Sequence, residues 1–176
     1  MVHTRLDLDR IRGARDVIDP VFLTSPLYPC DALGGRLGCQ VSIKLETANP
    51  VRSFKGRGAE LVASHLADQG AAALVCASAG NLGQALGWSG RRRGLDVTVV
   101  ARRLAPAVKL DRIRSLGAHL ELVDGDFEVA RERAVTIGLE LVDAVSPGDA
   151  VLITLGRGAG RRTLSGSGRR RRPGGP

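Results

Sequence analysis

Apolar and polar residues follow two different periods along the chain, and glycine, proline or asparagine marks most of the changes between them. Residues 40–46 (QVSIKLE) alternate apolar with polar side chains, which is typical of a half-buried strand. Short apolar runs, which indicate more deeply buried strands, follow at residues 72–76, 96–100, 119–123 and 150–154. The pattern therefore predicts a series of strands separated by longer segments.

Helical periodicity fills the segments between these strands. It predicts helices over residues 5–18, about 54–68, about 82–92 and 106–116, and from about residue 127 onward. Ser53 is suited to cap the helix that starts near residue 54, and Gly70 and Gly117 are suited to end two of the helices. Regular alternation of strand and helix predicts right-handed βαβ units, and thus an α/β fold with a mainly parallel sheet and flanking helices.

The composition suits this fold. The chain has 176 residues, which is enough for one domain with a core, and 43 % of them are hydrophobic. Only 3 % are aromatic, so the core must be built from Ala, Val, Leu and Ile. Such side chains are typical of helices packed on a parallel sheet.

The positive charge is concentrated at the C-terminus. The formal net charge is +8, but residues 157–176 contain seven arginines and no acidic residue. Without them Lys+Arg falls from 26 to 19 against 18 acidic residues, which leaves +1. We therefore predict a basic disordered tail over residues 157–176 and no specific nucleic-acid partner. Non-specific binding of RNA or anionic lipid by the tail is the alternative.

Cysteine, histidine and hydropathy patterns argue against a metal site and a membrane span. The three cysteines and three histidines lack metal-ligand spacing, and Asp124 and Asp126 are predicted to form a turn with a helix cap. No apolar run approaches about 18 residues, and the N-terminus lacks the apolar centre of a signal peptide. We expect a cytoplasmic protein with no metal and no membrane contact.

Lys55 lies at a structured junction, in the segment PVRSFKGRG at residues 50–58. The pattern places it in the first turn of a helix, where a cation is electrostatically unfavourable. A lysine becomes a nucleophile when burial or nearby positive charge lowers its pKa, and Arg52 and Arg57 could supply such charge. The alternative is an ordinary solvated lysine on a helix face.

A second candidate segment, SAGNLGQ at residues 78–84, lies between a predicted strand and a predicted helix. Small residues let backbone N–H groups approach a ligand, and a helix N-terminus favours an anion. The glycine spacing differs from the GxGxxG pattern of dinucleotide-binding loops. A tight turn in which Asn81 caps the helix is an equally good interpretation of the spacing.

Taken together, the two segments resemble a known family. NPVRSFKGRG at residues 49–58 followed by ASAGNLGQ at residues 77–84 is similar to the fold-type II pyridoxal-phosphate enzymes. That group includes serine/threonine dehydratases, threonine synthase, cysteine synthase and the tryptophan synthase β chain. The ASAGN form is most similar to the dehydratase branch. The residue pattern resembles the family from about residue 20 to residue 134.

The resemblance implies roles for individual residues. Lys55 corresponds to the lysine that forms a Schiff base with pyridoxal 5'-phosphate and later moves the proton of the substrate Cα. Phe54 corresponds to a ring beside the cofactor, and Asn81 to the residue that hydrogen-bonds the cofactor's 3-hydroxyl oxygen. The loop that receives the substrate carboxylate is implied to comprise Ser78, Ala79, Gly80 and Asn81.

Toward the C-terminus the family pattern is interrupted. VTIGLE at residues 135–140 is similar to a GTIGLE segment of the family, but it follows Ala134 directly. Residues 150–159 resemble the strand that leads into a glycine-rich phosphate-binding loop, whose remnants are Gly156, Gly158 and Gly160. We therefore expect a truncated family member whose C-terminal half is incomplete.

The predicted division and function follow from this resemblance. We expect a truncated enzyme domain over residues 1–156, with a small subdomain at about 56–142, followed by the tail. The implied activity is a pyridoxal-phosphate-dependent lyase that removes the hydroxyl group of a hydroxy-amino acid by β-elimination. The alternative is an inactive α/β fragment of such an enzyme. The expected partner is a small amino-acid substrate, and a homodimer is expected only with the full-length fold.

Overall fold

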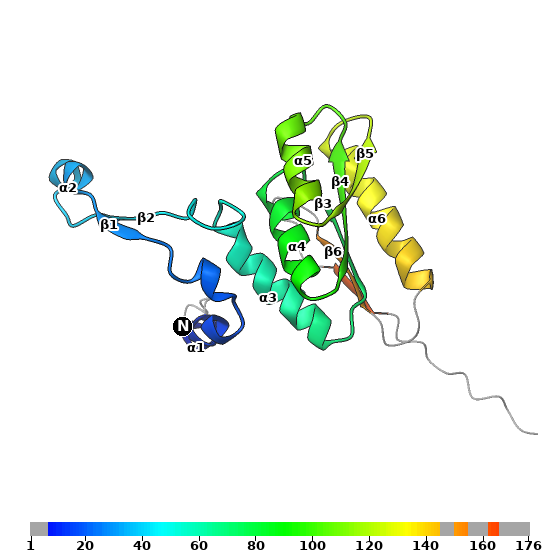
Figure 1. The fold of residues 1–176 in the computed structure, drawn as a ribbon, viewed down its shortest axis with the longest axis horizontal. Coiled ribbons are helices and arrows are strands. Elements are labelled where there is room, and N and C mark those ends of the chain that lie inside the picture. Colours follow the sequence, from blue (N-terminus) through cyan, green and yellow to red (C-terminus); the bar gives the residue numbers. More distant parts are fainter. Residues whose placement is uncertain (1–6, 145–149, 155–161, 166–176) are drawn as a thin grey trace, which may run out of the picture.

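The computed structural model describes residues 7–144, 150–154 and 162–165, and a five-stranded sheet lies at its centre (Figure 1). The strands are ordered β5-β4-β3-β6-β7, and each neighbouring pair from β5 to β6 is parallel. β7 is antiparallel to β6. The bounds are β3 Ala73–Ala77, β4 Asp96–Arg102, β5 His119–Val123, β6 Ala150–Thr154 and β7 Arg162–Ser165. The predicted α/β fold with a mainly parallel sheet is confirmed.

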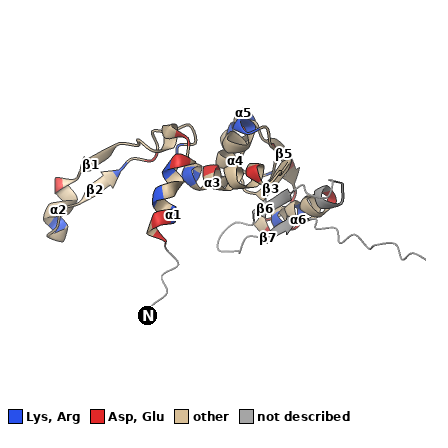
Figure 2. Cartoon of the chain, turned by 90° about the horizontal axis from the view of Figure 1, so that it is seen from below, with Lys and Arg blue, Asp and Glu red and all other residues tan. Residues whose placement is uncertain are grey.

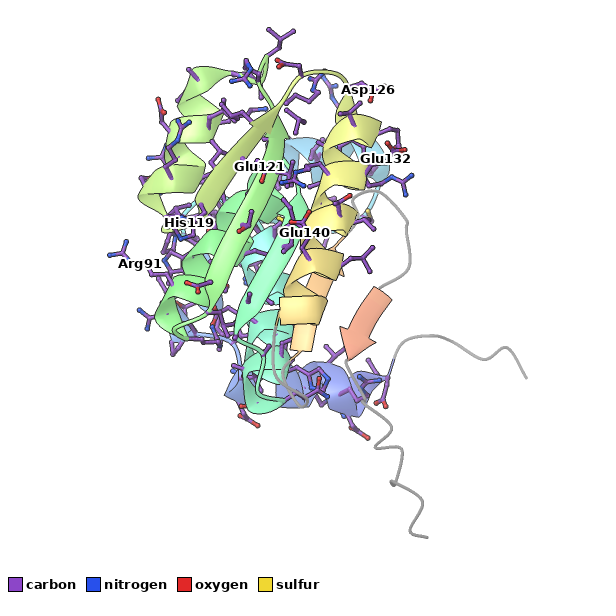
Figure 3. The ribbon with its side chains drawn as sticks, turned by 90° about the vertical axis from the view of Figure 1, so that its right-hand side faces the viewer. Arg91, His119, Glu121, Asp126, Glu132 and Glu140 are labelled. Carbon is purple, nitrogen blue, oxygen red and sulfur yellow. The ribbon has the colours of Figure 1, made fainter. Side chains whose placement is uncertain are left out.

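Helices cover both faces of the sheet (Figure 1, Figure 3). On one face α6 packs against β3, β4 and β6. On the other face α4 packs against β3 and β4, α5 packs against β5, and α3 packs against α4. Their bounds are α3 Lys55–Asp68, α4 Asn81–Arg92, α5 Ala107–Ser115 and α6 Phe127–Ala144.

The central strand β3 shows how the sequence divides the core between these two faces. All five of its residues are buried. Leu74 and Cys76 belong to the larger apolar cluster, which also contains side chains of α3 and α4. Val75 and Ala77 point the other way, into a smaller cluster with side chains of α6. A strand covered on both sides needs an uninterrupted apolar run, and ALVCA supplies it.

The N-terminal segment docks on α3 and α4 before it leads into an arm. It contains α1 (Leu8–Gly13) and two short 3₁₀ helices, η1 (Ala14–Asp16) and η2 (Pro20–Phe22). Phe22 is fully buried and meets Trp88 of α4 edge to face, with ring centroids 4.9 Å apart. This aromatic contact stabilises the N-terminal segment against the helices.

The arm projects away from the rest of the molecule (Figure 1). It consists of β1 (Leu27–Pro29), α2 (Asp31–Leu37) and β2 (Ser42–Lys44), and the two strands form an antiparallel pair separate from the main sheet. Every residue of both strands is exposed. The prediction of a half-buried strand over residues 40–46 is therefore wrong in burial and extent, because alternation alone does not supply a layer for the strand to pack on.

Other boundaries follow the prediction to within a few residues, with informative exceptions. Gly70 and Gly117 have φ angles of 83° and 100° after α3 and α5, as helix-ending glycines do. The helix predicted over residues 5–18 is instead divided into α1 and η1. Helix α2 was not predicted, since two adjacent glycines weaken its helical pattern.

Two features near the C-terminus differ from the sequence-based expectation. Residues 162–165, within the predicted disordered tail, form β7 because β6 offers an unpaired edge for backbone hydrogen bonds. The rest of that tail lies outside the described residues, and the proposed domain division stays a prediction.

Helix α6 continues without a break across residues 134 and 135, where the family pattern is interrupted. On this helix Arg133 donates hydrogen bonds to Glu121 and Glu140, and the bond to Glu121 raises the pKa of Arg133.

The described surface mixes charges of both signs. Figure 2 shows basic and acidic residues together on α1 and α2. Within the described ranges, no helix is both long and apolar enough to span a membrane.

Candidate functional site

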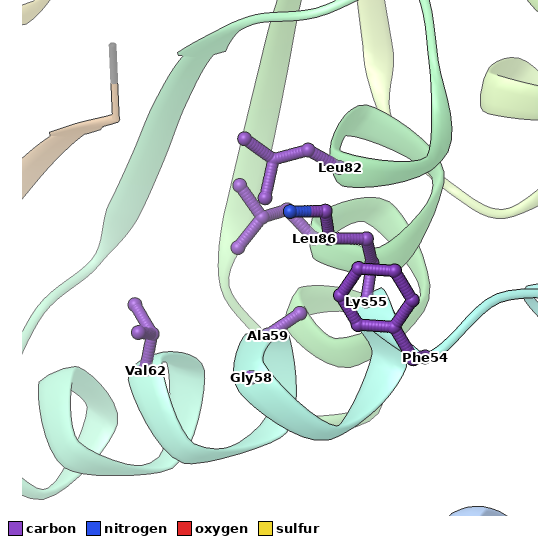
Figure 4. A pocket seen from close by; sticks show the side chains of 7 residues that line it. All are labelled: Phe54, Lys55, Gly58, Ala59, Val62, Leu82 and Leu86. Atoms are coloured by element: carbon purple, nitrogen blue, oxygen red, sulfur yellow. The ribbon is translucent and has the colours of Figure 1, made fainter. Parts of the chain in front are cut away.

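A pocket of about 240 Å³ opens between α3 and α4, with Lys55 at its edge (Figure 4). Helix α3 supplies one wall and α4 supplies the other. The lining side chains are mainly apolar. They belong to Phe54, Lys55, Gly58, Ala59, Val62, Leu82 and Leu86. The pocket therefore combines one amine with an apolar interior.

Lys55 is the first residue of α3, as the sequence predicted. Its Nζ lies 5.0 Å from the centroid of the Phe54 ring, and that ring is 60 % exposed. The face of an aromatic ring attracts a cation, which partly offsets the unfavourable position of Lys55 at the positive end of the helix. The amine is thus accessible to a reactant at the mouth of the pocket.

A hydrogen-bonded loop fixes the backbone in front of Lys55. The buried Asn49 side chain donates to the carbonyl oxygens of Glu46 and Ser53, and it accepts from the N–H groups of Val51 and Ser53. Ser53 Oγ in turn accepts from the Lys55 N–H at 3.3 Å. The Ser53 side chain therefore accepts from the first N–H of α3, but Phe54 occupies the cap position, so the prediction of Ser53 as the helix cap is wrong by one residue.

Gly56 allows the N-terminal segment to approach the first turn of α3. A Cβ atom at this position would lie 2.1 Å from Cε1 of Phe22. Only glycine leaves room for the ring. The buried Phe22 side chain therefore supports the helix turn directly beside Lys55.

The segment from Ser78 to Asn81 forms the turn between β3 and α4, at the carboxyl end of a central strand. Ser78 N–H donates to the carbonyl oxygen of Val100, and Ser78 Oγ accepts from the Gly80 N–H at 3.2 Å. A Cβ atom on Gly83 would lie 2.5 Å from the Ser78 carbonyl oxygen, so glycine is required for the close turn. Asn81 is exposed and begins α4; the cap position is occupied by Gly80. The interpretation of Asn81 as the helix cap is therefore wrong.

The predicted site residues form two neighbouring groups. Phe54 and Lys55 line the pocket, and Leu82, the residue after Asn81, lines its other wall. The residues from Ser78 to Asn81 do not line the pocket, although their turn leads into α4, which forms one of its walls. Gly156, Gly158 and Gly160 lie outside the described residues. Strand β6 runs parallel to β3 and pairs Thr154 with Cys76. The carboxyl end of β6 therefore lies at the same end of the sheet as the 78–81 turn.

The structure also shows how several other candidates are used. Arg57 donates to Glu46 Oε1 and to Ser25 Oγ, each at 2.9 Å, so its charge is already balanced by a carboxylate. Asp124 pairs with Arg103, and Asp126 Oδ1 accepts two N–H groups at the start of α6. Across the described ranges there is no cluster of three or more potential metal ligands.

The chain matches known proteins in sequence and in fold. The family model described as "Pyridoxal-phosphate dependent enzyme" matches residues 18–154, which include the pocket and the 78–81 turn. The chain belongs to this family. In sequence it is 35 % identical over 120 residues to an L-serine dehydratase/L-threonine deaminase of Homo sapiens, covering 66 % of this chain and 37 % of that protein. A biosynthetic L-threonine dehydratase of Haemophilus influenzae is 35 % identical over 136 residues, covering 76 % and 26 %.

Solved structures of the pyridoxal-phosphate enzyme family show the same fold. Threonine deaminase isoform 2 of Solanum lycopersicum, in its processed form, has a TM-score of 0.64 and 31 % identity, and the match covers 78 % of this chain and 39 % of that one. A serine racemase of Dictyostelium discoideum has a TM-score of 0.69 and 27 % identity, covering 84 % and 47 %. The chain therefore spans between about a quarter and a half of the length of these relatives.

The described residues suit the cofactor used by this family. Pyridoxal 5'-phosphate carries an aldehyde on an aromatic ring, and it is an anion. Lys55 presents an amine beside a ring and an apolar pocket, and the start of α4 presents backbone N–H groups to an anion. These features fit the chemical groups of the cofactor and its amino-acid adducts.

Sequence reasoning missed the residues that hold this site together. It quoted Asn49 only as part of the segment at residues 49–58, and it did not single out Phe22. It also gave no role to Arg112, which donates to the Pro50 carbonyl oxygen from α5 at 2.7 Å. A contact between residues 62 positions apart leaves no local pattern in the sequence.

Proposed function

We propose that this chain binds pyridoxal 5'-phosphate at Lys55 and supports β-elimination from a hydroxy-amino acid such as serine or threonine. The observation that carries the proposal is the amine of Lys55 at an apolar pocket, inside the segment that matches the family. The identity to serine and threonine dehydratases favours the substrate class. The activity, the substrate and the partners of a complete enzyme are proposals for this chain.

In this proposal the chain's own residues hold and orient the cofactor. Lys55 would hold the cofactor's aldehyde carbon through its amine, and the Phe54 ring beside that amine would cover one side of the reacting group. Asn81 would donate a hydrogen bond to the 3-hydroxyl oxygen, and Gly156, Gly158 and Gly160 would bind the phosphate. When bound, the cofactor withdraws electrons from the substrate Cα, which makes the Cα–H bond more acidic.

The substrate is held at the start of α4. Backbone N–H groups of the turn made by Ser78, Ala79, Gly80 and Asn81 receive the substrate carboxylate, and the dipole of α4 favours that negative charge. Lys55 then accepts the proton from the substrate Cα as a general base. The β-hydroxyl group would leave as water with the proton that Lys55 has taken from the Cα, and a later addition of water would release a 2-oxo acid and ammonia.

The alternative, an inactive α/β fragment, draws support from the small share of the relatives' length that the chain spans. In that case Lys55 and the 78–81 turn would keep their geometry without holding the cofactor. The substrate in the active case is a single small amino acid. A homodimer remains a proposal that depends on the full-length fold.

The sequence contains three lysines, Lys44, Lys55 and Lys109, so the lysine that carries the cofactor can be identified directly. The purified chain is titrated with pyridoxal 5'-phosphate, and its visible absorption band is recorded before reduction with borohydride. Peptide mass spectrometry then locates the pyridoxyl group. Wild type is expected to carry it at Lys55. Lys55→Ala should lose the band, and Lys109→Ala, which removes an exposed lysine of α5, should retain it.

Activity is measured on the same samples with serine and threonine, which yield pyruvate and 2-oxobutanoate respectively. Equal labelling of all three lysines in wild type would show that the chain has no specific cofactor site, and it would favour the inactive fragment. Specific labelling at Lys55 without 2-oxo acid formation would support cofactor binding and contradict the proposed elimination.

A further inference from the structure

One side chain of α5 reaches the loop of residues 49–54, which directly precedes Lys55. Arg112 lies on α5, which packs against α4 and β5, and its Nη2 donates to the Pro50 carbonyl oxygen at 2.7 Å. Arg112 is partly buried. Among the described residues, this is the hydrogen bond that ties residues 49–54 to α5.

The loop that receives this bond is internally rigid. Asn49, Val51 and Ser53 are buried, and the four hydrogen bonds of the Asn49 side chain all stay within residues 46–53. Arg52 has a φ angle of 54°, a conformation that a non-glycine residue adopts only when its surroundings hold it there. A hydrogen bond that fixes Pro50 therefore also fixes the position of Ser53 in the same loop.

Ser53 connects this loop to the backbone of Lys55 by hydrogen bonds. Its Oγ accepts from the Lys55 N–H, and its carbonyl oxygen accepts from the Gly56 N–H. The exposed side chains of Phe54 and Lys55 emerge from this fixed turn, with the amine 5.0 Å from the ring centroid. Their relative orientation thus depends on the loop rather than on burial of the side chains themselves.

We propose that Arg112 is a positioning residue for Lys55. By holding the Pro50 carbonyl oxygen it fixes the loop, and through Ser53 it sets the direction in which the Lys55 amine points. A rigid direction matters because proton transfer at the substrate Cα requires close alignment of the amine with the C–H bond. This inference rests on the proposed function of Lys55 as the amine that carries the cofactor and moves the proton.

The position of Lys55 can be measured without any cofactor. Reductive methylation with ¹³C-formaldehyde gives one dimethylamine NMR signal for each of the three lysines and one for the N-terminus, and Lys55→Ala identifies the Lys55 signal. The nearby Phe54 ring shifts that signal through its ring current. In Arg112→Met, which keeps the apolar stem, the Lys55 signal should move toward that of the exposed Lys109.

The matched control is Arg114→Met on the same helix, since among the described residues the Arg114 side chain bonds only to the exposed Asp111. It should leave the Lys55 signal in place. Arg112→Lys retains one donor and should restore part of the wild-type shift. A Lys55 signal that is unchanged in Arg112→Met, in protein whose circular dichroism matches wild type, would overturn the inference.

A second readout uses the cofactor-loaded protein. The rate at which the Cα hydrogen of serine exchanges with solvent deuterium should fall about 10- to 100-fold in Arg112→Met, with the half-saturating serine concentration changed by less than about threefold. An equal exchange rate in Arg112→Met and wild type would contradict the inference. If wild type shows no exchange and no cofactor band, the proposed function fails, while the NMR signal still decides whether Arg112 positions Lys55.

Discussion

At the scale of single residues, Gly56 is the position where the fold leaves least room beside the candidate site. Replacing it with alanine would put a methyl group within 2.7 Å of three atoms of the buried Phe22 ring. Since Phe22 is fully buried, the ring has no space into which to withdraw. Gly56→Ala is therefore expected to lower the free energy of unfolding by about 1–3 kcal/mol, as overpacking does. Urea unfolding monitored by circular dichroism measures the change.

Gly58 provides the control, because it lies in the same helix and a Cβ atom there meets no atom of the described residues within 4 Å. Gly58→Ala is expected to raise the free energy of unfolding by about 0.5–1 kcal/mol through helix propensity. If both substitutions changed stability in the same direction and by the same amount, the close packing of Phe22 against Gly56 would be contradicted.

At the scale of elements, a buried ion pair joins α3 to the end of α4. The Glu60 side chain is 1 % exposed, and Arg93 donates to its two carboxylate oxygens at 2.8 and 2.9 Å. Glu60 Oε2 also accepts from the N–H of Asp19, which ties the N-terminal segment to the same point. The two walls of the Lys55 pocket are thus connected by a second contact about one and a half turns beyond Lys55.

Removal of one partner should destabilise this connection strongly. Glu60→Ala leaves Arg93 partly buried without its carboxylate, so the free energy of unfolding is expected to fall by about 3–5 kcal/mol. The double variant with Arg93→Ala should lose less than the sum of the two single variants. The same cycle on the exposed pair Asp111 and Arg114 should give a coupling below about 1 kcal/mol. Additive losses at Glu60 and Arg93 would show that the pair does not join the helices.

Elements with a strong local pattern could be predicted from the sequence, and those that depend on a partner could not. Strands β3 to β6 are apolar runs bounded by turn residues, and their limits agree with the prediction to within two residues. Helix α2 contains Gly34 and Gly35, and it ends at Gly38 with a φ of 67°, so capping rather than periodicity defines it. The exposure of β2 could not be predicted, because alternation shows a strand but not what covers it.

The candidate site likewise contains residues that could be predicted from the sequence and contacts that could not. Lys55 and the 78–81 turn lie in contiguous motifs, so their identity and their places at the starts of α3 and α4 could be predicted. The side-chain bonds of Asn49 and the link from Arg112 to Pro50 could not, because they arise only when distant segments are brought together. The residues proposed to carry the chemistry can therefore be identified from the sequence, whereas the contacts that orient them cannot.

At the scale of the whole molecule, the chain combines a layered α/β body with a thinly supported arm. Leu27 and Leu37 in the arm are 63 % and 66 % exposed, whereas Leu74 and Val75 of β3 are each 1 % exposed. A two-stranded antiparallel pair with no covering layer is marginally stable in water. The body and the arm should therefore open with very different free energies.

Amide hydrogen exchange on the intact chain tests this contrast. Amides of β1 and β2 should exchange at least about 100-fold faster than those of β3 and β4, because the arm buries little apolar surface. The ladder amides of β4 serve as the internal standard, since that strand pairs on both sides. Equal protection of the arm and the body would contradict an uncovered arm in solution. Repeating the measurement over a range of protein concentrations would then show whether a second copy of the chain covers it.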